Sequence, residues 1–89
     1  RGMARFYLNA KPGVDLRKLM DDVKARVDVI DNFPTETERP RIFIPQSSTS
    51  SEFQILRVAV TGQLDDFDLL KVARQVRQDI VDMPGVSIA

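Results

Sequence analysis

Hydrophobic and polar residues alternate at the start of the chain, which predicts a half-buried strand over residues 3–10. A Pro-Gly turn follows. Apolar residues then recur at helical spacing over residues 16–30, with Asp15 placed to cap the first turn. The helix must end before Pro34, because proline lacks a backbone N–H and restricts the residue before it. A second strand is expected over residues 41–44, which completes a strand–helix–strand unit.

The same succession of patterns occurs a second time. Residues 53–61 alternate as a strand, Asp65 or Asp66 is placed to cap a helix, and a further strand begins at Val86. The apolar stripe of this second helix consists of Leu69, Leu70, Ala73, Val76, Ile80 and Met83. One face of the strand is more apolar than a solvated face should be, so we expect it to meet a partner or a ligand. That face is formed by Phe53, Ile55, Arg57 and Ala59.

A serine-rich connector, residues 46–52, separates the two units and contains no large apolar residue. Apolar positions of the two units fall into register at an offset of 50 residues, as Leu19 does with Leu69, which indicates an internal duplication. Two such units in tandem predict an α+β fold of the ferredoxin-like type, β-α-β-β-α-β. The antiparallel sheet then has both helices on one face. We expect the uncovered face, which carries Tyr7, Phe53 and Ile55, to contact another molecule.

The last four residues resemble a strand that has just begun. Natural domains seldom end within a strand, so we expect the chain to be a fragment of a longer protein. A short native tail is the alternative.

The composition of the chain limits the kinds of partner and functional site that it can have. The chain has 89 residues, with 13 Lys+Arg balanced by 13 Asp+Glu, and the zero net charge argues against nucleic acid or an anionic membrane as a partner. It has no cysteine and no histidine, which removes disulfides, thiolate zinc sites and the commonest general base. No phosphate-binding glycine motif and no apolar run of about 20 residues is present. We therefore predict no catalytic residue, metal or cofactor.

The acidic clusters have ordinary explanations. Asp21 and Asp22 are neighbours on a helix, where consecutive side chains diverge by about 100°, so they do not converge on one ion. Asp65, Asp66 and Asp68 lie at a helix start, where they compensate the helix dipole.

The sequence argues against two further roles, a serine nucleophile and the binding of RNA bases. A serine nucleophile in the connector would have no base to activate it, because the chain has no histidine and no lysine in a suitable motif. Phe43 and Phe53 lie near strand ends and have the chemistry to stack on RNA bases, but the neutral charge argues against that role.

Six motifs carry a family resemblance. The second unit contains Leu56-Arg57-Val58-Ala59-Val60-Thr61-Gly62, Val72-Ala73-Arg74-Gln75-Val76-Arg77 and Met83-Pro84-Gly85-Val86. The first unit contains Pro12-Gly13-Val14-Asp15, Phe33-Pro34 and a strand over residues 41–45 that runs into the serine-rich joint. In this order and spacing they resemble the porter region of resistance-nodulation-division (RND) efflux transporters of the acriflavine-resistance type.

The resemblance implies a place in a larger assembly. RND pumps are proton-driven homotrimers of the bacterial inner membrane that work with a periplasmic adaptor and an outer-membrane channel. Residues 1–45 resemble the second half of the first porter subdomain, and residues 53–89 resemble the first half of the second. Residues 46–52 then form the crossover between the subdomains. The chain would lie in the periplasm and would not transport alone, because the proton relay belongs to membrane helices.

The resemblance also implies a ligand site. The porter cleft of the family accepts varied amphiphilic small molecules. By position, Ser51, Phe53 and Leu56 match places that line this cleft, while Arg5 and Tyr7 lie on the strand face that matches the cleft side. Thr49 and Glu52 depart from the plain serine run that is usual in the family.

Alternatives stay open for the association of the two units and for the function of the chain. The isolated units are expected either to close on each other or to exchange between two chains as a dimer. The alternative to a pump segment is a soluble ferredoxin-like regulatory or protein-interaction domain. An acylphosphatase-like enzyme is a third possibility, but the loop over residues 10–14 lacks the arginine cradle and the asparagine that it would need.

Overall fold

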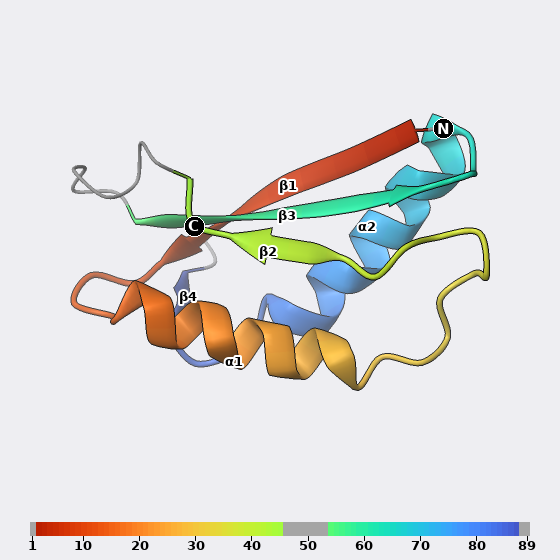
Figure 1. Cartoon of the computed structure of the whole chain (residues 1–89). Helices are drawn as coiled ribbons and strands as arrows, with labels where there is room; N and C mark the ends of the chain where they lie inside the picture. Colours follow the sequence, from red (N-terminus) through yellow and green to blue (C-terminus); the bar gives the residue numbers. More distant parts are fainter. Residues whose placement is uncertain (1, 46–53, 88–89) are drawn as a thin grey trace.

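The computed structural model describes residues 2–45 and 54–87. Strand, helix and strand follow one another twice, so the predicted α+β class is confirmed (Figure 1). The elements in chain order are β1 (Gly2–Ala10), α1 (Leu16–Asp28), β2 (Arg41–Phe43), β3 (Ile55–Gly62), α2 (Asp66–Ile80) and β4 (Val86–Ser87).

The four strands form one sheet in the order β2-β3-β1-β4, and every neighbouring pair is antiparallel. Each unit therefore has its two strands separated by a strand of the other unit, which is the split arrangement of a ferredoxin-like fold. The long central pair runs from Gly2 opposite Gly62 to Asn9 opposite Ile55. Both helices lie on the same side of the sheet, as the two tandem units predicted, and α1 runs below the strands in Figure 1.

The core lies between the helices and the sheet. Even-numbered residues of β1 and β3 face the helices, since side chains alternate across a strand. Each large aliphatic side chain buried in this way contributes about 1.5–3 kcal/mol. The side chains that are fully buried are Val23, Val27, Leu56, Val58, Val60, Leu69, Val76 and Ile80.

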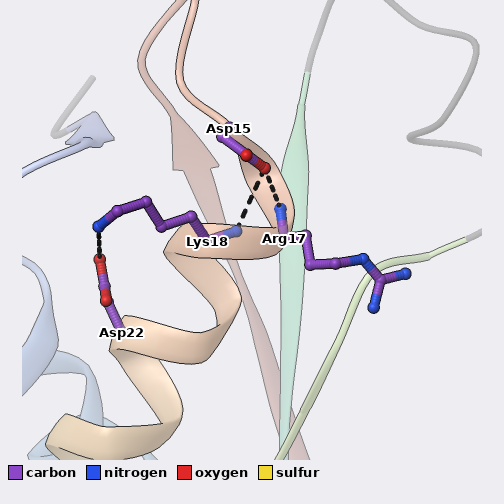
Figure 2. Close-up of polar contacts among 4 residues, drawn as sticks. All are labelled: Asp15, Arg17, Lys18 and Asp22. Atoms are coloured by element: carbon purple, nitrogen blue, oxygen red, sulfur yellow. Dashed lines mark hydrogen bonds and ion pairs between the residues drawn. The ribbon is translucent and has the colours of Figure 1, made fainter.

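Each helix is preceded by an aspartate that caps its first turn, and the two caps lie at equivalent positions of the two units. The Asp15 carboxylate accepts hydrogen bonds from the backbone N–H groups of Arg17 and Lys18, at 3.1 and 3.2 Å (Figure 2). Asp65, one of the two predicted caps, accepts from the N–H of Asp68 at 2.8 Å. Each cap satisfies donors that the first helical turn leaves without partners.

Figure 2 also shows an exposed ion pair on α1 between Lys18 and Asp22, at 3.2 Å. Both side chains are at least half exposed, and such a pair contributes only about 0–1 kcal/mol. This arrangement fits the expectation that Asp22 lies on a solvated helical face.

Both helices end earlier than their apolar stripes predicted. The N–H of Ile30 donates to Val27 O at 3.0 Å, and the N–H of Met83 donates to Ile80 O at 3.2 Å. These bonds span three residues, so each helix closes in a tight turn instead of another α-helical turn. The placement of Leu70 in the core was wrong, because it lies about 100° from Leu69 around α2 and is 42% exposed.

Candidate functional site

In the part of the chain that the structure describes, no helix covers the sheet face opposite α1 and α2, although Ala59 at the centre of this face is only 8% exposed. It carries side chains of β1, β2 and β3 in cross-strand rows. We call this surface the open sheet face, and its central residues are Arg5, Tyr7, Arg41, Phe43, Arg57 and Ala59.

One row places an arginine between two aromatic rings. Arg57 on β3 lies opposite Tyr7 on β1 and opposite Phe43 on β2. Its guanidinium carbon is 5.4 Å from the centroid of the Tyr7 ring and 5.3 Å from that of the Phe43 ring. Its Nη2 also donates a hydrogen bond to Tyr7 Oη at 3.2 Å. Contacts of this kind contribute about 0.5–1 kcal/mol each at exposed sites, so the three side chains hold one another in place.

The Nε atom of Arg57 has a different environment. It is shielded from solvent and has no hydrogen-bond partner among the described residues. A buried donor without an acceptor costs about 1–3 kcal/mol, and more on a charged group.

The neighbouring row places two arginines on either side of a small residue. Ala59 on β3 lies opposite Arg5 on β1 and opposite Arg41 on β2. Both arginines are exposed, and neither makes an ion pair or a side-chain hydrogen bond with the described residues. With Arg57 in the next row, three positive charges share this face.

At the end of the face beyond this row lies a hollow of about 330 Å³, lined by Gly2, Met3, Glu38, Arg41 and Thr61. The hydroxyl of Thr61 donates to the Glu38 carboxylate at 2.9 Å. This carboxylate is thus at the rim of the open sheet face and is already bonded there.

The structure brings together two of the five residues that the resemblance assigned to a ligand site. Arg5 and Tyr7 both lie on the open sheet face. Leu56 does not join them, because it points to the helices and is fully buried in the core. Ser51 and Phe53 lie outside the described residues, as does the connector over residues 46–52.

Sequence reasoning placed Arg57 and Ala59 on a strand face that was expected to meet a partner or a ligand, but it did not bring Arg41 or Phe43 next to them. Alternation along each strand indicates which residues share a face, but it does not show which strands are neighbours. The arginine and aromatic rows exist because β3 lies between β1 and β2.

The described residues contain no group of three or more acidic side chains that could hold a metal ion. Among them, no helix has the length and apolar character needed to cross a membrane. Comparison with protein-family models, with curated proteins and with solved structures gives no significant match.

Proposed function

We propose that this chain is a periplasmic porter segment of a proton-driven RND multidrug efflux pump. The observation that carries the proposal is the succession of six motifs along two strand–helix–strand units, in the order and spacing of the porter region. The chain itself would perform no chemistry. Its role would be to form part of the path for amphiphilic small molecules in the assembled pump.

The positions of the Pro-Gly motifs support this proposal. Gly13 precedes α1 and has a φ of 82°, and Gly85 follows α2 and has a φ of 92°. Glycine adopts this left-handed region at little cost, whereas other residues are strained there. Two of the six motifs that carry the resemblance thus occupy turning points at which the backbone favours glycine.

The proposal assigns the chain a place and partners. The segment would lie in the periplasm, as part of an inner-membrane homotrimer that contacts an adaptor and an outer-membrane channel. Arg5 and Tyr7 would face the substrate cleft, as the resemblance implies. Proton coupling would reside in other parts of the pump.

Reading the gene on both sides of this chain tests the proposal. An RND pump requires one apolar segment of about 20 residues upstream and blocks of several such segments downstream. The complete reading frame, expressed in an efflux-deficient bacterium, should then raise the inhibitory concentration of amphiphilic drugs. A short reading frame without apolar segments would overturn the proposal.

A self-contained ferredoxin-like interaction domain is the second candidate. The observation that favours it is that both units share one sheet within a single chain, with β3 inserted between β1 and β2. Such a domain needs no other subdomain to complete its sheet. The same reading of the gene separates the two candidates, because only the pump requires membrane segments.

A further inference from the structure

We infer that the open sheet face binds small organic anions that carry an apolar group, such as alkyl or aryl sulfonates and carboxylates. Arg5 and Arg41 hold the anionic head over Ala59, and the apolar part lies against the β1 side chains next to Arg5. This is a property of the chain folded on its own, and it goes beyond the pump proposal.

The spacing of the arginines suits a single oxyanion. Arg5 and Arg41 are separated by one strand, which places their backbones about 10 Å apart. Both side chains are long and exposed, and Ala59, the 8% exposed residue between them, has no bulky side chain that would keep their guanidinium groups apart. Guanidinium groups bind sulfonate, phosphate and carboxylate oxygens through paired N–H donors.

The charge of this face differs from that of the chain. The net charge is zero, yet Arg5, Arg41 and Arg57 are gathered within two adjacent rows. Within the described part of the chain, Glu38 is the carboxylate at the rim, and it is bonded to Thr61. Glu38 keeps its negative charge, but three arginines against this one carboxylate leave an excess of positive charge, which raises the local potential and attracts anions.

Apolar surface lies beside the positive charges. Met3 and Tyr7 flank Arg5 on the same face of β1 and are 56% and 47% exposed. They offer a place for the apolar part of a ligand whose head is bound by Arg5. Arg57 contacts the rings of both Tyr7 and Phe43 and so holds the Tyr7 side chain in position before a ligand binds. This lowers the entropy cost of ordering the side chain on binding.

The same clamp argues against a nucleic acid. Single-stranded nucleic acids bind open sheets by stacking bases on exposed aromatic faces. Here the Arg57 guanidinium lies over one face of the Tyr7 ring and one face of the Phe43 ring, which leaves less aromatic surface for stacking of successive bases. A compact anion requires only the free arginines of the next row.

Titration of the 89-residue chain with octane-1-sulfonate, below its micelle concentration, tests the inference. Tyr7 is the only tyrosine and the chain has no tryptophan, so intrinsic fluorescence reports on this face, and calorimetry gives the affinity. We expect saturable binding of octane-1-sulfonate that weakens with salt. We expect no saturable binding of octyltrimethylammonium, which has the same tail and the opposite charge.

Paired variants locate the site. The double variant Arg5→Gln with Arg41→Gln should weaken octane-1-sulfonate binding about tenfold, because two charge-assisted contacts are lost. The control is Arg17→Gln with Arg74→Gln, which removes the same charge from exposed positions on the two helices and should change the affinity less than twofold. All four side chains are exposed, so neither double variant disturbs the core.

Several results would overturn the inference. Equal weakening by both double variants would indicate attraction by overall charge and no site. Binding of the ammonium compound with similar affinity would indicate a purely apolar surface. Tighter binding of a uridine oligonucleotide than of the sulfonate would assign the face to nucleic acid.

The inference and the pump proposal can fail separately. A chain that binds the sulfonate but whose gene encodes no membrane segments would keep this site and lose the pump proposal.

Discussion

The position of Leu56 differs between the family resemblance and the structure. The family resemblance gives it a place at a ligand cleft, whereas the structure buries it completely between the sheet and both helices. Leu56→Ala should therefore lower the free energy of unfolding by about 3 kcal/mol, within the usual range of about 2–5 for a buried leucine. The loss combines the transfer free energy of the deleted carbons with the cavity that they leave.

The adjacent residue provides the matched control. Ile55 has the same size, lies one position away on the same strand, and is only half-buried on the other face of the sheet. Ile55→Ala should lower the free energy of unfolding by about 1 kcal/mol, because less apolar area is returned to water. Leu56→Val, which deletes one methylene, should also cost about 1 kcal/mol and keeps the chain folded if the alanine variant unfolds.

Urea unfolding followed by far-ultraviolet circular dichroism measures these differences. With an m value of about 1 kcal/mol/M, Leu56→Ala lowers the midpoint by about 3 M, and Ile55→Ala lowers it by about 1 M. A folded chain of this size has a total stability of only about 4–13 kcal/mol, so the larger loss is easily seen. If Leu56→Ala shifted the midpoint no further than Ile55→Ala, Leu56 would not be in the core and this placement of β3 would be refuted.

Four other substitutions test separate features of the fold. Asp15→Ala and Asp65→Ala each remove a helix cap and should each cost about 1 kcal/mol in urea unfolding, and no loss in either variant would contradict the capping roles. Gly62→Ala places a Cβ 2.5 Å from the backbone oxygen of Glu36, so the backbone must move and the thermal midpoint should fall by an amount equivalent to about 1–3 kcal/mol; an unchanged midpoint would disprove this close approach. Arg57→Met should change the free energy of unfolding by less than about 1 kcal/mol, because the lost ring contacts are offset by removal of the unpartnered Nε, and a loss above about 2 kcal/mol would show that the guanidinium is mainly structural.

The features that were predictable from the sequence are local ones. Asp15 and Asp65 could be identified as caps because a cap needs only its own side chain and the next few N–H groups. The alternation over β1 predicted which of its residues face the core, since side chains alternate along any strand. The fold class followed from two repeated units, because few topologies accommodate two such units in tandem.

The features that were missed depend on contacts between distant segments. The α2 stripe included Leu70 because it is apolar and adjacent to Leu69, but only the packing of the sheet decides how wide the buried face is. Likewise, placing Leu56 at a cleft required a strand face that the pairing with β1 excludes. A shift of one residue in register moves every side chain of a strand to the other face. An error of this size changes the predicted site residues but leaves the predicted fold class unchanged.

The arginine rows also connect the candidate site to the way in which the two units meet. Arg5 and Arg41 come from the first unit, but Ala59 between them comes from the second, as does Arg57 in the next row. The rows therefore exist only where β3 is inserted between β1 and β2. In a pump, each unit is expected to pair with a subdomain half outside this chain, and the rows would then be separated. Anion binding by the isolated chain thus reports closure of the two units on each other, and its absence from the complete protein would indicate that they pair elsewhere.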